Sequence, residues 1–422
     1  MKPKFSTFIL LWLTQGLSSL GSALTNYAFI LWFTLVIFPD VGERSQLTFT
    51  LTMITLLMVL PYVCISPIAG VWVDRLDRKK IMIVADVILA ILTLVMIGYI
   101  HFYSSGLAPI FLLLALISLV GAFHSLAFDS SYILIVSEDH LGRANGMMQT
   151  MHTLTGVLGP ILAATLFIYY GRENGLEMIL LIDAMTFLIS AFCIVFFKIP
   201  SPLMKEIVQE VKSTYWIEIK EGFFYLKQQK QLLGLLLLGF ILTFVVSSDF
   251  LLPLVVKDQL LQNRTSLGWS YEFSYSFVES MGLLGGAIAG VVMGIWGGPK
   301  KYLISSILVT CCFVGFFVVG LGATSLIWLA GPFFSIRLFS EVLFRSIDSI
   351  VWQKTVPPAM QGRVFGLKRL FAYIAAPLGT VILGWFASHT STSQVLIPLG
   401  LVLVLITGII GLGLYFLRVI KV

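Results

Sequence analysis

One short charged segment, GVWVDRLDRKK at residues 70–80, joins two long apolar segments of this chain. It contains four cations and two carboxylates, whereas residues 48–72 and 81–102 are almost entirely apolar or small. Each flank has about 20 such residues, which is the length that an α-helix needs to cross a bilayer. Because the charged groups require water, the pattern predicts two membrane-spanning helices joined by a tight loop at one membrane face.

Apolar segments of this length recur along the whole chain. Its 422 residues are 58% hydrophobic and 11% charged, whereas about a quarter of the residues of a soluble domain are charged. We therefore expect an all-α membrane protein with twelve transmembrane helices, near residues 8–37, 48–72, 81–102, 108–131, 145–170, 177–198, 232–257, 273–297, 301–323, 325–351, 364–388 and 394–417.

The cations predict the orientation of these helices. When alternate loops are assigned to one side, starting with the N-terminus, most of the 27 Lys and Arg residues fall on that side. Short loops rich in Lys and Arg stay in the cytoplasm. We therefore expect a multi-pass protein of a bacterial plasma membrane with both termini cytoplasmic. The net charge of +6 fits such loops, and the sequence shows no basic face for nucleic acid.

The two halves of the chain carry an internal repeat. A shift of 220 residues (290 − 70, 363 − 143, 379 − 159) aligns three separate pairs, Gly70 with Gly290, Arg143 with Arg363, and Gly159 with Gly379. Parallel repeats of this kind are common in transporters. The repeat predicts two six-helix bundles in the same orientation, residues 1–198 and 232–422, joined by a cytoplasmic amphipathic linker, residues 199–231.

The charged segment also follows a known loop signature. The pattern G-x-x-x-D-R-x-G-R-K is matched by Gly70, Asp74, Arg75, Arg78, Lys79 and Lys80, with Asp77 in place of the second glycine. The segment resembles the loop between the second and third helices of the major facilitator superfamily. With Ala85 and Asp86, it resembles the branch that contains macrolide efflux proteins and related siderophore exporters. This resemblance implies the major facilitator fold, in which two pseudo-symmetric bundles enclose a transport path.

The same resemblance implies a cytoplasmic gate. Asp74 is expected to meet the positive N-terminal end of a helix in the other half, near Arg363, while Arg75 and Arg78 meet carboxylates at the inner face. Such contacts would close the cytoplasmic side and would break for inward opening. The predicted gate also includes Gly70 and Arg143. The alternative is that these cations only fix the topology.

The sequence lacks the motifs of ATP-driven pumps and of common enzymes. It has no G-x-x-x-x-G-K-[ST] loop, no Ser-His-Asp pattern and no H-E-x-x-H metal motif. Its four cysteines lie in apolar segments without metal-ligand spacing. We expect no enzyme activity, no metal and no cofactor. The energy for transport would then come from an ion gradient or from the substrate's own gradient, and we expect a proton gradient.

The tenth span holds the densest set of ionisable residues. Such residues cost about 2.5–3.5 kcal/mol each at the centre of a spanning helix. Arg337, Glu341, Arg345 and Asp348 share one helical face. Because the first, fourth, seventh and tenth helices line the central cavity of the family, the resemblance places this face on the substrate and proton pathway. Arg337 and Glu341 either neutralise each other or act as a coupling switch when Glu341 binds a proton.

Other spans contribute isolated carboxylates. Asp249 in the seventh span and Glu279 in the eighth are further candidates for the proton pathway, although Asp249 could instead reach the outer water. Asp183 in the sixth span is interpreted as structural. Asp86 and Asp129 lie near the cytoplasmic ends of their helices, where pairing with the loop cations is the favoured interpretation.

Polar residues in the first and fourth spans complete the predicted pathway. Gln15, Ser19, Ser22 and Asn26 recur every three or four residues, and such a stripe either lines a cavity or bonds a neighbouring helix. Because the first helix lines the cavity in the family, the first interpretation is favoured. His124 could titrate near physiological pH, but a hydrogen-bonded packing histidine is favoured.

Small residues in the fifth span resemble the antiporter motif of proton-coupled drug exporters. The matching residues are Gly156, Gly159 and Pro160, while Ala163 and Ala164 stand where the motif has two glycines. Small residues permit close helix contact, and proline lets a helix bend. This motif favours export over uptake.

These features predict a secondary transporter that exports an amphipathic small molecule, drug-like or macrolide-like, by proton antiport with alternating access. The expected partners are that substrate and the lipid bilayer, and the chain is expected to act as a monomer. A siderophore or lipid exporter is the alternative within transport. A membrane receptor or scaffold without turnover is the alternative from another class.

Overall fold

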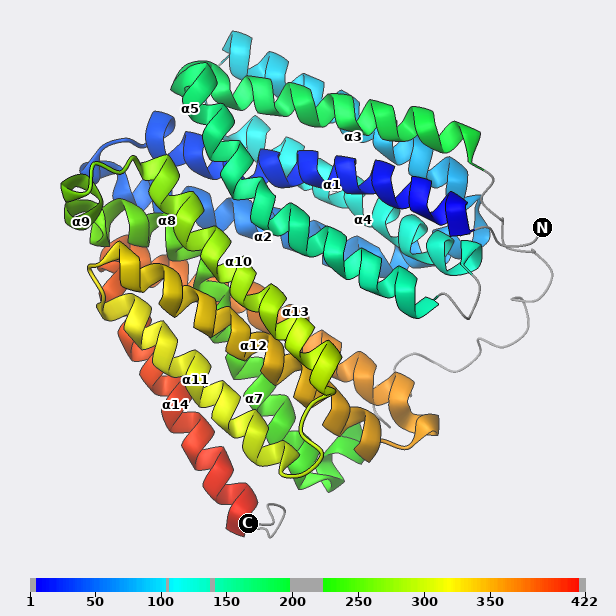
Figure 1. The fold of residues 1–422 in the computed structure, drawn as a ribbon, viewed down its shortest axis with the longest axis vertical. Coiled ribbons are helices and arrows are strands. Elements are labelled where there is room, and N and C mark those ends of the chain that lie inside the picture. Colours follow the sequence, from blue (N-terminus) through cyan, green and yellow to red (C-terminus); the bar gives the residue numbers. More distant parts are fainter. Residues whose placement is uncertain (1–4, 104–105, 137–140, 198–222, 417–422) are drawn as a thin grey trace. The chain divides into compact units, whose positions relative to one another are not determined.

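The computed structural model describes residues 5–103, 106–136, 141–197 and 223–416. Every regular element among them is a helix (Figure 1). The chain forms two compact units, Met1–Gln209 and Glu210–Val422. The boundary lies inside the predicted linker, of which residues 199–222 fall outside the described residues and residues 223–228 are helical.

The first unit is built from five long helices. They are α1 (Phe5–Trp32), α2 (Arg44–Arg75), α3 (Arg78–Tyr103), α4 (Ala108–Ile135) and α5 (Leu141–Phe196), with two short segments, the π-helix η1 (Phe33–Ile37) and the 3₁₀-helix η2 (Val41–Glu43). Helix α5 contains two spans, because the backbone of Gly171 leaves helical geometry at φ 81° and ψ 162°. A side chain at this left-handed φ would be strained, so glycine permits the turn.

The second unit contains five long helices and a broken one. The broken span consists of α7 (Lys230–Val246), the 3₁₀-helix η4 (Ser247–Leu251), α8 (Leu252–Leu254) and the π-helix η5 (Val255–Gln259). After the short α9 (Leu261–Ser266) follow α10 (Tyr271–Trp296), α11 (Leu303–Ala323), α12 (Ile327–Thr355), α13 (Pro358–His389) and α14 (Thr392–Phe416).

The described residues contain 12 helical spans that are long and apolar enough to cross a membrane, the first at Thr7–Ile37 and the last at Thr392–Leu414. Each coincides with a predicted span to within a few residues, so the prediction of an all-α protein with twelve spans is confirmed. Many large apolar side chains on these helices, such as Phe192, Ile295 and Phe316, are exposed. Such exposure is what lipid requires of a spanning bundle.

The charged segment is more helical than a tight loop of eleven residues would be. Helix α2 continues to Arg75 and α3 begins at Arg78, which leaves two residues between them. Asp77 Oδ1 accepts hydrogen bonds from the backbone N–H groups of Lys79 (3.0 Å) and Lys80 (3.4 Å). Asp77 is thus the N-cap of α3, and its carboxylate offsets the cations in the first turn.

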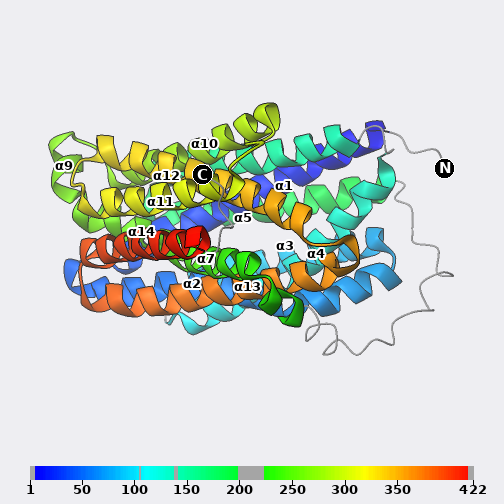
Figure 2. The ribbon, with the colours of Figure 1, turned by 90° about the horizontal axis from the view of Figure 1, so that it is seen from below.

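The packing inside each unit repeats. Helix α1 packs on α5, α2 on α4, and α3 on both α4 and α5; in the second unit α7 packs on α13, α10 on α12, and α11 on both α12 and α14. Figures 1 and 2 show the last pair, α11 in yellow and α14 in red, running side by side. Each unit therefore arranges six spans in the same order of contacts.

Two glycines mark equivalent close contacts in the two units. A Cβ added to Gly159 of α5 would lie 3.0 Å from Ala23 Cβ and 3.2 Å from Tyr27 of α1. A Cβ added to Gly379 of α13 would collide with Ser247 Oγ and lie 2.7 Å from the Phe244 carbonyl oxygen. Since 379 − 159 and 247 − 27 both equal 220, the repeat seen in the sequence is also a repeat of side-chain contacts.

Candidate functional site

Arg337 lies at the centre of an ion-pair cluster in the second unit. Its Nη2 donates to Asp249 Oδ2 at 2.6 Å, and its Nη1 donates to Glu341 Oε2 at 3.3 Å. The side chain of Arg337 is only 1% exposed, and its Nε has no hydrogen-bond partner among the described residues. The two carboxylates that the sequence presents in different spans therefore share one guanidinium.

Asp249 lies where the seventh span loses its α-helical geometry. The residue is part of the 3₁₀-helix η4, followed after a few residues by Pro253 and the π-helix η5. Proline removes a backbone donor, and 3₁₀ and π segments within a helix frequently occur at functional sites. The Asp249 side chain keeps 39% of its surface exposed, so one oxygen can bind Arg337 while the carboxylate remains accessible.

The cluster continues along α12 and reaches α13. Arg345 Nε donates to Glu341 Oε1 at 2.8 Å. One turn further, Asp348 is 3% exposed and binds Lys368 Nζ at 2.5 Å and Trp352 Nε1 at 2.9 Å. The six ionisable groups comprise three cations (Arg337, Arg345, Lys368) and three carboxylates (Asp249, Glu341, Asp348), for a net charge of 3 − 3 = 0 when all are ionised. Protonation of any carboxylate would leave one positive charge.

A cavity of about 260 Å³ lies between α7, α12 and α13, at the Asp348 end of this cluster. Its wall combines Arg345, Asp348 and Lys368 with the aromatic rings of Phe240 and Phe371. Charged groups therefore lie beside apolar rings in this cavity of the second unit.

The polar stripe on α1 is largely occupied by contacts within the first unit. Gln15 Nε2 donates to Ser190 Oγ at 2.7 Å, and Ser22 Oγ donates to Asp183 Oδ1 at 3.3 Å. Gln15 is 2% exposed. Gln15 and Ser22 therefore follow the second interpretation of the stripe, hydrogen bonds to a neighbouring helix, and not the favoured interpretation that they line a cavity. The reason is that the sixth span presents its own polar groups at the same depth. Asn26 is half-buried on the same helix.

The structure corrects the interpretation of Asp86 as a partner of the loop cations. Asp86 is fully buried, its Oδ2 accepts from Ser190 Oγ at 2.7 Å, and its Oδ1 lies 3.0 Å from His124 Nε2. Asp86 points into the bundle, because α3 turns this position away from its charged N-terminus. His124, favoured as a packing residue, is therefore one half of a buried acid–imidazole pair. Asp129 is exposed near the end of α4.

Of the predicted gate residues, Gly70 lies in α2, and Arg78 donates to the carbonyl oxygens of Val73 (3.4 Å) and Ser130 (3.0 Å). Arg78 thus binds the end of α2 to α4. The side chains of Asp74, Arg75, Arg143 and Arg363 lie outside the described residues, so the gate stays a prediction.

The remaining candidates lie within helices. Gly156 and Pro160 are inside α5, and Gly159 forms the close contact with α1 described above. Asp183 is 3% exposed and also accepts from Thr25 Oγ1 at 2.8 Å, in keeping with a structural role. Glu279 is half-buried on α10.

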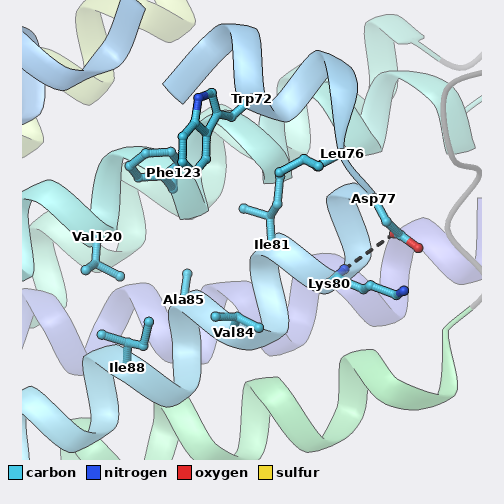
Figure 3. Close-up of a pocket in the computed structure, with 10 residues that line it drawn as sticks. All are labelled: Trp72, Leu76, Asp77, Lys80, Ile81, Val84, Ala85, Ile88, Val120 and Phe123. Atoms are coloured by element: carbon cyan, nitrogen blue, oxygen red, sulfur yellow. Dashed lines mark hydrogen bonds between the residues drawn. The ribbon is translucent and has the colours of Figure 1, made fainter. Parts of the chain in front are cut away.

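A larger groove lies outside these charged clusters. This groove has a volume of about 550 Å³ and is lined mainly by apolar side chains of α2, α3 and α4 (Figure 3). Trp72 and Phe123 meet edge to face in its wall, with ring centroids 5.9 Å apart, and the capping residue Asp77 and Lys80 line its charged end.

Sequence reasoning missed Ser190 and Lys368, which connect the two clusters to neighbouring helices. Ser190 is one of several serines in apolar spans, and Lys368 lies just beyond the predicted start of the eleventh span. When a polar residue on one span contacts a carboxylate on another span, the local sequence around either residue shows no pattern that predicts the contact. Only the i to i+4 pairs of α12 were accessible, because both partners lie on one helix.

Comparison with known proteins places this geometry in a family. Residues 11–380 match the Major Facilitator Superfamily. The chain is 28% identical over 395 residues to macrolide efflux protein A of Streptococcus pyogenes, covering 92% of this chain and 91% of that protein. It is 29% identical over 333 residues to macrolide efflux protein A of Enterococcus faecalis, covering 77% and 97%.

Among solved structures, the crystal structure of the D323A mutant of the nucleoside transporter NupG is similar, with a TM-score of 0.72, 10% identity, and coverage of 96% of this chain and 98% of that one. At that identity the likeness concerns the fold alone. The family match over most of the length, the twelve spans and the six-span units agree: this chain is a multi-pass membrane transporter that belongs to the major facilitator superfamily.

Proposed function

We propose that this transporter exports amphipathic small molecules, macrolide-like in character, in exchange for protons. The two macrolide efflux relatives support the direction and the substrate class. The cavity that mixes charges with aromatic rings in the second unit supports an amphipathic ligand. Because the sequence has no P-loop motif for ATP hydrolysis, the energy comes from an ion gradient or from the substrate's own gradient, and we propose the proton gradient.

The observation that carries proton coupling is the bridge from Arg337 to both Asp249 and Glu341. When Asp249 binds a proton, Arg337 loses one counter-charge and pairs with Glu341 alone. The ionic tie between the broken seventh span and α12 then weakens. Removing one partner of a fully buried ion pair costs about 3–5 kcal/mol. Because Asp249 is partly exposed, the change is smaller here, but a smaller change still shifts the balance between two conformations.

We propose roles in transport for the remaining candidates as well. Asn26, Glu279 and His124 belong to the proposed substrate and proton pathway, and Gln15 contributes from behind it by positioning its neighbours. The cytoplasmic segment around Asp74 is the proposed gate. The protein would act as a monomer in the plasma membrane with both termini in the cytoplasm.

Transport into proteoliposomes tests the proposal directly. Full-length protein would be reconstituted and supplied with a radiolabelled macrolide under an imposed pH gradient. We expect macrolide movement that a protonophore abolishes. Asp249→Asn and Glu341→Gln should each lose at least about tenfold of this gradient-driven flux, while macrolide exchange without a gradient persists, because exchange requires no proton transfer. Asp40→Asn, a change at an exposed carboxylate, is the matched control.

Each contrary result has a distinct meaning. Macrolide binding without flux in the unmodified protein would favour a receptor. Gradient-driven flux of a siderophore or a lipid, with none of a macrolide, would replace the substrate class. Unchanged coupling in both carboxylate variants would remove the cluster from the mechanism.

A further inference from the structure

Four residues from four spans of the first unit form a continuous polar chain. Gln15 of α1 donates to Ser190 of α5 at 2.7 Å, and Ser190 donates to Asp86 of α3 at 2.7 Å. The other oxygen of Asp86 lies 3.0 Å from His124 Nε2 of α4. Gln15, Ser190 and Asp86 are at most 2% exposed. The chain is therefore enclosed inside the bundle.

Ser190 connects Gln15 to the Asp86 carboxyl group. The single hydroxyl hydrogen of Ser190 is donated to Asp86 Oδ2, and the hydroxyl oxygen accepts from Gln15. Both bonds thus hold the Asp86 carboxyl group in a fixed position. A buried carboxylate is unfavourable without a cation beside it. A charged imidazole at His124 supplies that cation.

The facing atoms of this pair have no other partner. Neither Asp86 Oδ1 nor His124 Nε2 makes a hydrogen bond with any described residue. The two atoms are close but not aligned for a hydrogen bond, so a small rotation of the imidazole separates a bound proton from the carboxylate or brings it closer. Such a position suits a proton that must be held and then released.

We propose that His124 and Asp86 bind one proton inside the first unit, at a site separate from the Arg337 cluster, and that Ser190 and Gln15 position the carboxylate. On loading, the proton adds to His124 Nε2 and the imidazolium faces Asp86 Oδ1. On release, the same proton leaves and Asp86 stays bonded to Ser190. Histidine suits this role, because its charge changes between pH 5 and 8. As a step in transport, the site rests on the proposed proton exchange.

The exposed edge of the pair determines how the proton arrives. His124 keeps 14% of its side-chain surface exposed, whereas Asp86 keeps none. Nε2 itself is buried beside the carboxylate, so a proton has to pass the partly exposed ring to reach it, and Asp86 is the fixed counter-charge behind it. This order agrees with a transporter that must load its proton from one side of the membrane at a time.

Other titratable groups surround the pair. On α4, the exposed Asp129 lies close enough to feel the charges of His124 and of His152 on α5. Asp183 of α5 accepts hydrogen bonds from Thr25 and Ser22. On α2, the Tyr62 hydroxyl is hydrogen-bonded to Ser125 Oγ. Asp129 is thus a second carboxylate near His124. An Asp129→Asn variant therefore has to be measured beside Asp86→Asn.

A measurement that needs no transport tests the site itself. Full-length protein with ¹⁵N-labelled histidine, in lipid nanodiscs, would be examined by NMR between pH 8 and 5. The chain has five histidines, and the signal missing from His124→Gln identifies His124. We expect that signal to change from imidazole to imidazolium in this range, also in an Asp249→Asn background. A His124 signal that keeps one form throughout would overturn the proposal.

Transport assays then test its role. His124→Gln and Asp86→Asn should lose at least about tenfold of gradient-driven macrolide flux and keep exchange. Ser190→Ala should shift the pH profile of transport with a smaller loss, and it remains informative if Asp86→Asn does not fold. His389→Gln, a change at an exposed histidine of α13 in the second unit, should transport normally. Normal gradient-driven flux in both His124→Gln and Asp86→Asn would overturn the role. Absence of such flux in the unmodified protein would instead contradict the proposed function, and the NMR result would still decide the site.

Discussion

Arg337 Nη2 lies 2.6 Å from Asp249 Oδ2, so a single guanidinium ties the middle of α12 to the point where the seventh span leaves α-helical geometry. The two residues are 88 positions apart in the chain. This contact converts two separate carboxylates, Asp249 and Glu341, into one cluster around a common cation. Loss or gain of a proton by one of these carboxylates therefore changes the electrostatic environment of the other.

The first prediction concerns the guanidinium itself. Arg337→Gln leaves Asp249 without its cation and Glu341 paired with Arg345 alone. It should lower the free energy of unfolding by about 3–5 kcal/mol, towards the lower end because Asp249 is partly exposed. Arg337→Lys keeps the charge but loses the fork that binds two carboxylates at once, so its loss should be smaller. Thermal unfolding in detergent measures both. The double variant Arg337→Gln with Asp249→Asn should recover part of the loss, and no recovery would mean that the bridge adds little to stability.

The second prediction concerns the equivalent glycines. Gly159→Leu and Gly379→Leu place a branched side chain where a Cβ alone already meets the neighbouring helix, so each should lower the melting temperature and transport. Overpacking of this kind costs about 1–3 kcal/mol. Gly98→Leu is the control, because nothing lies within 4 Å of the Cβ position at Gly98. Similar stability of all three variants would show that close approach at the repeat position is not required.

The third prediction concerns the residue that departs from the family signature. Asp77→Ala removes the cap of α3 and should cost about 0.5–2 kcal/mol, whereas Asp77→Gly, which restores the residue of the signature, should cost only a few tenths. Hydrogen exchange of the Lys79 and Lys80 amides reports on this turn directly, because both donate to Asp77. Equal exchange rates in the unmodified protein and in Asp77→Ala would rule out the capping role.

The fourth prediction concerns the Asp348–Lys368 pair of the cluster. Lys368→Met removes the cation from Asp348, which is 3% exposed, and should destabilise the second unit by about 3–5 kcal/mol. Lys368→Arg keeps the charge and its contact with the Trp352 ring, and should preserve most of the stability. The exposed Lys354→Met is the control. Thermal unfolding with Trp fluorescence measures the difference, and a stable Lys368→Met protein would contradict the pairing.

Much of the architecture follows from the sequence alone. A helix in lipid must satisfy its own backbone hydrogen bonds, so the length of each apolar segment predicts a span without reference to its neighbours. The repeat could also be predicted from the sequence, because residues such as Gly159 and Gly379 recur at a fixed offset. Within the site, sequence spacing predicted the Arg337–Glu341 pair, since both residues lie on one helix.

Tertiary structure decided which polar groups meet across helices. Gln15 and Ser190 are 175 residues apart, and Asp86 turned out to face His124 instead of the loop cations. Hydropathy does not encode the rotation of a spanning helix, because its lipid-facing and buried sides are both apolar. The number, length and repetition of the helices could therefore be predicted from the sequence, whereas the ion-pair cluster and the buried acid–imidazole pair depend on packing between helices.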